Sequence, residues 1–573
     1  MFSDMLMNLS FIHEKYICIF IILFTKTKPM RSIYVVIITL ALIFSCKQKR
    51  TNLAETKKPN IIYIMSDDHT TQGIGAYESR LAKLNPTPTI DRIAKEGVLL
   101  ENVFCTNSIC TPSRASILTG QYGQVNGVVD LSGSLKPENQ YLAIEMGKLG
   151  YQTAMIGKWH LKHAPEAFDY YNVLPGQGDY INPTLYAKEG GKEMEIKFEE
   201  DLVRTVNATK YEGHSSDVIT DISLDWLKNK REKNKPFFLM HHFKAPHDFF
   251  EYAPRYENYL ADVTIPEPES LWDNKNNGSI ATKGLNNSLT DTIGSSVGHR
   301  NVIRNMGMHM GIDPNIPDPE YKRLAYQEYL KRYLRCVKGV DDNVKRLFDY
   351  LEEAGLMENT IIVYTGDQGF MLGEHDYIDK RWMYEESMRM PFLVRYPKKI
   401  KAGSRVDAMV NNTDFAPTLI NMGGGKTPDY MQGSSFDKIL ETGEEPEDWK
   451  KETYYRYWMH MAHNHNNPAH FGIRTKDYKL IFFYGRDYNT ERNVEAQEWA
   501  HNPESMSYFN TPPAWEFYDL KNDSKEMDNL YGDENYADVI SDLKIRLKKL
   551  RADVKEDDTP YPQIEKVLEE YWD

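Results

Sequence analysis

The sequence predicts an α/β protein in which helices cover both faces of a large sheet, followed by a smaller C-terminal α+β subdomain. Apolar strands alternate with amphipathic helices, charged residues follow the strands, and 573 residues suffice for a large domain and a smaller one. The 83 acidic and 69 basic residues give a formal net charge of −14, which argues against nucleic-acid binding as the main function. An anionic substrate would therefore need locally concentrated cations.

Residues 1–58 are predicted to be an export signal and tether outside the fold. From Met30, a short positive start precedes an apolar run over residues 33–44 and then Cys46. This order resembles a bacterial lipoprotein signal peptide, in which Cys46 becomes lipidated. An N-terminal anchor helix is the alternative, although the run is short for a membrane span. Both interpretations predict export, to the periplasm or the cell surface, with membrane contact only through the anchor.

Residues 59–425 are predicted to form the catalytic domain, and four of their apolar strands run directly into polar or charged side chains. These side chains are Asp67 and Asp68 after the first strand, Lys158 and His160 after the second, His247 after the third, and Asp367 and Gln368 after the fourth. Adjacent carboxylates at one strand end are unfavourable unless a cation lies between them, which favours a divalent metal over a helix cap. Because functional side chains of α/β sheets gather at strand ends, we expect the four sets to meet.

The other elements continue the alternation of strands and helices. Helices are predicted from Thr87, from Cys110, from Asp217 to Lys228 and from Tyr321 to Glu353, and further strands over 98–104 and 391–395. The helix from Tyr321 has the clearest pattern, because its apolar residues alternate steps of four and three and share one face. Residues 174–183 are predicted to be a turn-rich loop that serves as a lid or a substrate loop, and residues 265–320 an insertion with little regular structure.

Residues 426–573 are predicted to form the smaller subdomain and to contribute to substrate binding. Residues 471–474 and 478–484 have the pattern of strands in a small antiparallel sheet, and the last helix is expected over 537–549. This region also carries Arg456, His460, His463, His465, His470 and Arg474. We interpret these side chains as a substrate subsite, with a histidine metal tract as the alternative.

Cys110 begins the run Cys-Thr-Pro-Ser-Arg, which continues through small and aliphatic residues to Gly120. This Cys-x-Pro-x-Arg core resembles the signature of type I sulfatases. In that family a formylglycine-generating enzyme oxidises the cysteine to formylglycine (3-oxoalanine), whose hydrated aldehyde is the nucleophile. Without the other motifs, a buried cysteine at a strand-to-helix turn would explain the run equally well. The five cysteines show no framework spacing, so neither disulfides nor a structural zinc site is expected.

The resemblance covers most of residues 59–400 and implies an alkaline-phosphatase-like mixed sheet with a calcium site. The implied ligands of the one calcium ion are Asp67, Asp68, Asp367, Gln368 and the residue made from Cys110. Gln368 departs from the Asn or His more usual in the family, but its amide carbonyl is still an oxygen ligand of the kind calcium prefers.

The resemblance also implies the catalytic roles. Arg114 and Lys158 would orient the formylglycine hydrate, and Lys158 and Lys380 would neutralise the sulfate oxygens. His247 would donate a proton to the departing sugar oxygen, and His160 would take one from the second hydroxyl of the hydrate. Related enzymes bind sugar through the small domain, which points to His470 and Arg474.

The predicted function is hydrolysis of sulfate esters on a sulfated polysaccharide or oligosaccharide. One alternative is a phosphate or phosphonate ester hydrolase of the same superfamily. Those relatives generally use Thr or Ser as nucleophile, or two transition metals, and Cys110 argues against the first kind. The other alternative is a catalytically dead glycan-binding protein, which would not need both His160 and His247.

Overall fold

The structure is a computed structural model that describes residues 57–199, 202–283, 297, 311–462, 465, 467–489 and 510–573. The predictions for the signal region, Cys46 and His463 concern residues outside these ranges. Residues 58–573 form one compact unit. None of the helices in the described ranges has the length and apolar character needed to cross a membrane.

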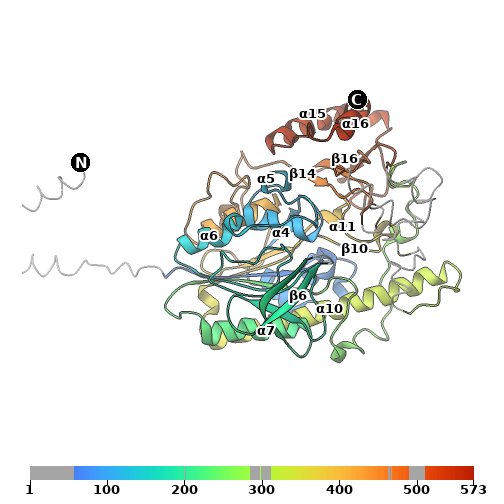
Figure 1. Cartoon of the computed structure of the whole chain (residues 1–573). Coiled ribbons are helices and arrows are strands. Elements are labelled where there is room, and N and C mark those ends of the chain that lie inside the picture. Colours follow the sequence, from blue (N-terminus) through green and yellow to red (C-terminus); the bar gives the residue numbers. More distant parts are fainter. Residues whose placement is uncertain are drawn as a thin grey trace, which may run out of the picture. The chain divides into compact units, whose positions relative to one another are not determined.

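One mixed sheet of 11 strands organises this unit and confirms the predicted α/β class (Figure 1). Its spatial order is β13 (Ser404–Asn411), β2 (Val98–Phe104), β12 (Phe392–Arg395), β9 (Thr360–Gly366), β1 (Asn60–Ser66), β8 (Phe237–Phe243), β3 (Gln152–Lys158), β4 (Tyr170–Leu174), β5 (Thr184–Ala187), β7 (Leu202–Lys210) and β6 (Lys192–Glu199). The central strand β1 pairs in parallel with β8 and β9, and β3 pairs in parallel with β8. The carboxyl ends of these four strands therefore lie at one edge of the sheet.

Helices cover both faces of the sheet, as the alternation of elements predicts. The face with α4 (Cys110–Thr119), α6 (Tyr141–Lys148) and α12 (Phe415–Met422) lies opposite the face with α3 (Pro88–Lys95), α7 (Ser215–Asp225) and α10 (Glu320–Glu353) (Figure 1). In β1, Tyr63 and Met65 join the first core, whereas Ile62 and Ile64 join the second. Since both faces are buried, the central strands are continuous apolar runs.

The hairpin of β6 and β7 forms the outer end of the sheet and is absent from the sequence prediction. In β6, Glu193, Glu195 and Lys197 are exposed while Ile196 and Phe198 are buried. Charged residues have low strand propensity, and this half-exposed pattern is weaker than that of the central strands. Its position at the sheet edge explains why half of its side chains face water.

The predicted small antiparallel sheet is also present, with strand order β14 (Glu452–Tyr457), β15 (His470–Thr475), β16 (Tyr478–Phe483) and β17 (Ala514–Asp519). One face carries α15 (Ala537–Asp553) and α16 (Pro562–Tyr571), and residues of the other face, such as Tyr455 and Tyr457, join the core of the large sheet. The prediction that the helix from Ala537 is the last one is wrong. Pro562 starts a further helix, as proline often does at a first helical position, and this helix buries Ile564 and Val567.

The segment 265–320 agrees with the predicted insertion over its described residues. Apart from the first residue of α10, residues 265–283, 297 and 311–320 carry regular structure only in the 3-10 helix Glu269–Leu271. Residues 175–183 connect β4 to β5 without regular structure, and Gln177 reaches from this connection to Lys158.

Candidate active site

Cys110 is the first residue of α4 and lies beside the carboxyl ends of the central strands. Its Sγ is 3.4 Å from Oδ1 of Asp67 and 3.4 Å from Nζ of Lys380, and the side chain is 1% exposed. Burial, and then the charge of Asp67, raises the pKa of the Cys110 thiol. Nucleophilic cysteines instead have a lowered pKa, so this environment does not activate a thiolate.

Three buried carboxylates lie together at the ends of β1 and β9. Asp67 and Asp68 follow β1, Asp367 follows β9, and one carboxylate oxygen of each lies within 4.8 Å of the others. The left-handed backbone of Asp68, at φ 65°, places its N–H 3.1 Å from Oδ1 of Asp367. Buried carboxylates are stable only when cations or strong donors compensate them.

Three buried cations provide this compensation. Arg114 donates from Nε to Oδ2 of Asp367 at 2.9 Å, Lys158 pairs with Asp67, and Lys380 lies 2.6 Å from both oxygens of Asp68. Lys380 follows β11 (Ile378–Asp379), whose antiparallel partner is β10 (Met371–Leu372). The structure thus brings together the three cations to which the resemblance assigns roles, Arg114 and Lys158 at the formylglycine hydrate and Lys158 and Lys380 at the sulfate.

Gln368 completes a set of oxygen atoms suited to a metal. Its Nε2 donates to Oδ1 of Asp68 at 2.5 Å, while its Oε1 is buried without a hydrogen-bond partner. A carbonyl oxygen without a partner beside three carboxylates matches the hard oxygen ligands of calcium. The residues present at this position therefore fit the metal that the resemblance implies.

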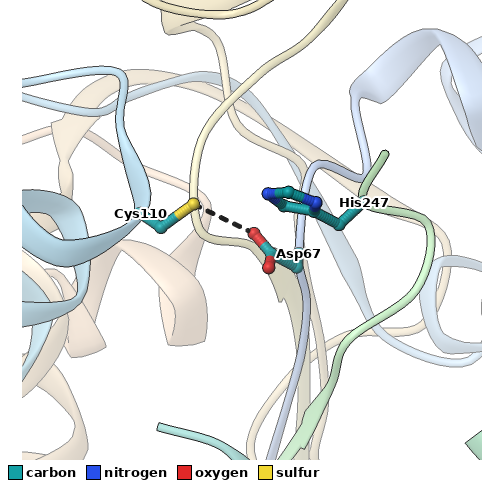
Figure 2. A group of neighbouring side chains, drawn as sticks. All are labelled: Asp67, Cys110 and His247. Carbon is teal, nitrogen blue, oxygen red and sulfur yellow. Dashed lines mark hydrogen bonds between the residues drawn. The ribbon is translucent and has the colours of Figure 1, made fainter. Parts of the chain in front are cut away.

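Two histidines face the same group from other strand ends. Nε2 of His247 is 3.8 Å from Oδ2 of Asp68, and Nδ1 of His247 is 2.6 Å from Oδ1 of Asp248. Figure 2 shows Cys110 and His247 flanking Asp67. Burial, then Lys158 and Lys380, lowers the pKa of His247 to about 4. His160 is buried with no partner on Nδ1, and burial followed by Lys158 lowers its pKa as well.

A cavity of about 180 Å³ opens above Cys110. Its lining residues are Ile109, Cys110, Leu131, Gln177, His247, Asp248, Asp379, Lys380, Arg381 and His465. Asp379, Arg381 and His465 form its polar wall, with Nδ1 of His465 2.8 Å from Oδ2 of Asp379. The sequence prediction does not assign Asp379, Arg381 or Gln177 to the site, although Asp379 and Arg381 flank Lys380 directly and Gln177 lies in the predicted substrate loop.

The structure does not bring His470 and Arg474 to this cavity. His470 is fully buried, its Nδ1 lies 2.7 Å from the carbonyl of Pro468, and its ring contacts Phe483. Arg474 pairs with Glu385 and lines a different cavity, of about 490 Å³, which does not contain Cys110. Both residues belong to β15, whereas His465, in the connection before that strand, lies beside the nucleophile position.

Arg456, which the sequence analysis places in the same predicted subsite, also lies in a buried ion-pair network and not in the cavity. It is 1% exposed and lies between two carboxylates, with Nη1 2.7 Å from Glu556 and 2.8 Å from Asp558. These ion pairs connect the small sheet to the segment after α15. Arg456 does not line the cavity above Cys110.

Comparison with known proteins identifies the family of this chain. The sulfatase family model matches residues 59–425, and a model of the C-terminal region of N-sulphoglucosamine sulphohydrolase matches residues 373–504 and 487–553. The chain is 37% identical over 538 residues to an N-acetylglucosamine-6-O-sulfatase of Bacteroides thetaiotaomicron, with 88% of each chain covered.

Solved structures show the same fold. One, in complex with its substrate D-glucosamine-2-N,6-O-disulfate, matches at TM-score 0.72 and 35% identity over 88% of this chain and all of the other. The phosphonate monoester hydrolase of Agrobacterium radiobacter shares the fold at TM-score 0.63 and 18% identity, covering 87% of this chain and 96% of the other. The family match, the 37% identical relative and the alkaline-phosphatase-like fold show that this chain belongs to the sulfatase family and is a sulfatase.

Proposed function

We propose that this sulfatase removes the 6-O-sulfate from a terminal glucosamine or N-acetylglucosamine unit of a sulfated glycan. The observation that carries the proposal is the cavity above Cys110, which is lined by His247 and Lys380 and by the polar side chains of Asp379, Arg381 and His465. Lys380 connects this cavity to the buried carboxylates, because its Nζ lies 2.6 Å from both oxygens of Asp68. The activity named for the 37% identical relative and the sugar bound in the similar structure support this choice of sugar and position.

Two groups complete the proposed site. Asp67, Asp68, Asp367 and Gln368 would hold one calcium ion, whose positive charge helps to bind the sulfate. Formylglycine, made from Cys110 by a formylglycine-generating enzyme, supplies a hydrated aldehyde as an oxygen nucleophile. The neutral, buried state of the Cys110 thiol supports this role, because the thiol itself is a poor nucleophile here.

The charged side chains bind and orient the sulfate. Lys158 and Lys380 neutralise its oxygens from two sides of the cavity base, as charge stabilisation in sulfuryl transfer requires. Arg114 holds Asp367 and the Lys158 carbonyl, at 2.9 and 2.8 Å, and so fixes the positions of both groups. If the carboxylates bind calcium, they compensate the positive charges of these side chains less. A bound sulfate would then provide the compensating negative charge.

The two histidines move protons. Nε2 of His247 faces the cavity and donates a proton to the departing sugar oxygen, while Asp248 holds Nδ1. Because Lys158 and Lys380 lower the pKa of His247, a sulfate that neutralises them raises this pKa and favours the protonated donor. His160, neutral and without a partner on Nδ1, accepts the proton whose removal releases sulfate from the enzyme.

The polar wall recognises the sugar. Asp379, Arg381 and His465 offer an acceptor, a donor and an imidazole in the same cavity as Lys380, which suits the hydroxyls of one sugar ring. A cavity of about 180 Å³ is about the size of one sugar unit, so we propose exo action on a terminal sugar. Residues 59–425 then form the catalytic domain, and residues 426–573 contribute to substrate binding through His465.

We also propose export with a lipid anchor on Cys46, on the basis of the signal-like sequence described above. Labelling of cells with a radioactive fatty acid tests this part. Label on the wild-type chain and none on Cys46→Ala would support it, whereas equal label on both would contradict it.

The experiment that tests the proposed activity begins with maturation. The chain is produced with a formylglycine-generating enzyme, and the peptide containing Cys110 is weighed. The mature protein is then incubated with glucosamine sulfated at O3, O6 or N, with galactosamine sulfates as controls, and free sulfate is measured. We expect aldehyde at Cys110 and release from the 6-O-sulfated glucosamines only. A peptide with thiol alone beside a converted control sulfatase would overturn the nucleophile, and release from another position would overturn the substrate.

A further inference from the structure

A second group of ligand-type side chains lies outside the active site and consists of His375, Glu386 and Glu526. One ligand atom from each of these side chains lies within 4.8 Å of the other two. His375 belongs to the 3-10 helix Glu374–Asp376 between β10 and β11, Glu386 to α11 (Glu385–Met388), and Glu526 to the segment after β17. We propose that this group binds a divalent transition-metal ion, such as zinc or manganese.

His375 provides the first argument. The side chain is 0% exposed, and neither ring nitrogen has a well-formed hydrogen bond with another described residue. Its pKa is lowered to about 3 by burial and then by Lys283 and Lys479, while the backbone of Lys525 acts in the opposite direction. The ring is therefore neutral and can offer a lone pair. A buried imidazole without a strong partner is costly, and a metal bond would remove that cost.

The balance of charge gives the second argument. Glu385 pairs with Arg474, and Glu526 lies 2.6 Å from Lys479. For Glu386, no ion pair with a described residue is found, and its Oε2 is buried without a partner. Burial, and then the nearby Glu374 and Glu526 carboxylates, raises the pKa of Glu386. The group thus has one carboxylate that lacks an ion pair with a cation of the described residues, and only the more distant charge of Lys479 favours its ionised form.

The ligand types indicate the kind of metal. One imidazole nitrogen and two carboxylates suit zinc or manganese, whereas calcium takes oxygen ligands. Glu386 also lines the cavity of about 490 Å³, so an ion and a water molecule can reach this group from solvent. The calcium site proposed above differs in its ligand types and in its location. Its ligands are oxygen atoms, and it lies near the other cavity.

The position of the group suggests what the ion does. His375 lies on the hairpin that carries Lys380, and Glu526 lies on the segment that follows the small sheet. An ion bound to both would fasten the hairpin to the small-sheet region. We infer that the ion is structural and supports the position of Lys380 without contacting substrate.

The test uses the full-length chain with Cys110→Ala, because Asp67, Cys110 and His247 could also take a soft metal while the thiol is present. The chain is stripped with chelator, saturated with calcium and titrated with Zn²⁺ and, separately, with Mn²⁺. Calorimetry gives the affinity, elemental analysis the stoichiometry, and thermal melting the change in Tm. We expect one transition-metal ion per chain and a higher Tm on binding.

Two variants and a matched control locate the ion. His375→Gln and Glu386→Gln should each weaken binding about tenfold or more. Glu267→Gln should bind as the parent does, because Glu267 lines the same cavity but accepts from Trp272 and is not in the group. The proposal is overturned if the parent binds neither metal in the presence of calcium, or if both ligand variants bind as tightly as Glu267→Gln. If circular dichroism shows that a variant does not fold, the metal titration of the parent protein alone tests the proposal.

Discussion

Nζ of Lys380 lies 2.6 Å from both carboxylate oxygens of Asp68. The same ammonium is 3.4 Å from Sγ of Cys110, so one cation contacts both a proposed metal ligand and the position of the nucleophile. In the proposed mechanism Asp68 would be one of the ligands of a calcium ion, and Lys380 would then be available to the sulfate. The substitutions below test this division of charge and the other proposed roles.

Replacement of Lys380 by methionine should lower kcat about 10²- to 10³-fold, because a buried positive charge beside the transferring sulfate is lost. Methionine keeps the length of the side chain, so packing changes little. The measurement is the initial rate of sulfate release from a 6-O-sulfated glucosamine. Lys235→Met, at an exposed position, is the control and should be fully active. A Lys380→Met rate within a factor of three of the control would contradict the role.

Removal of the Gln368 carbonyl should weaken calcium binding. Gln368→Leu retains the volume but removes Oε1, the buried oxygen without a partner, so we expect the calcium requirement for activity to rise about tenfold or more. Activity of chelator-treated enzyme is measured against added Ca²⁺. Gln368→Asn keeps a carbonyl and should lie between Gln368→Leu and wild type. Identical calcium curves for all three proteins would exclude Gln368 as a ligand.

His247→Gln should distinguish substrates by their leaving groups. Loss of a general acid costs about 10²- to 10⁴-fold when the leaving oxygen is a sugar alkoxide, but little when it is a nitrophenolate that needs no proton. We therefore expect a large loss of kcat on the sugar sulfate and a small one on the aryl sulfate. Equal losses on both substrates would show that His247 acts in another way.

The polar wall of the cavity should affect sugar recognition and not the sulfate chemistry. Arg381→Ala and His465→Ala are expected to raise KM for the sugar sulfate about tenfold or more, by removal of charged or polar contacts. The rate on a small aryl sulfate should change little. His470→Ala is a poor control because His470 is a core residue, so Lys476→Ala, at an exposed position, is preferred. Unchanged KM in both wall variants would place the sugar elsewhere.

Asp341 should make stability depend on pH. Its Oδ1 accepts the N–H groups of Thr89 and Ile90 at the start of α3, both at 2.9 Å, and burial raises its pKa to about 6. Since this folded-state pKa exceeds the ordinary value of 3.8, the contribution of Asp341 to stability falls as pH rises from about 4 to 6. The shift corresponds to at most about 3 kcal/mol.

Denaturant unfolding of wild type and Asp341→Asn at pH 5 and pH 7.5 checks this. Asparagine keeps one acceptor oxygen for the two N–H groups but cannot ionise, so the variant should gain stability relative to wild type as the pH rises. Asp342→Asn, at the neighbouring half-exposed position, should show no such trend. Parallel pH profiles for Asp341→Asn and wild type would rule out the effect.

The sequence is sufficient to predict which strand ends bring polar and charged side chains together beside Cys110. Asp67, Lys158, His247 and Asp367 follow apolar runs that could only be central strands, and parallel strands bring their carboxyl ends to one edge. Such a prediction needs only the apolar run that marks a buried strand and the position at which that run ends. The helix that begins at Cys110 could be recognised for the same reason.

The polar wall of the cavity, which we propose to bind the sugar, could not be predicted in this way. His470 and Arg474 lie four residues apart on β15, so both point to the same face, but the sequence does not show that this face is packed against the core. Arg381 and His465 reach the cavity from two irregular segments, where no periodicity shows direction. The second metal-ligand group could not be predicted for the same reason, because His375, Glu386 and Glu526 meet only through the packing of three short segments.

The outer strand of the large sheet has a consequence for the behaviour of the protein in solution. A sheet edge offers unpaired N–H and C=O groups to a neighbouring molecule, and such edges can join into aggregates. On β6, Glu193, Glu195 and Lys197 stand along this edge, so a second copy that approached it would have to desolvate a row of charges. We expect the 11-stranded sheet to end at β6 in concentrated solution as well as in the isolated molecule, without continuing from one copy to the next.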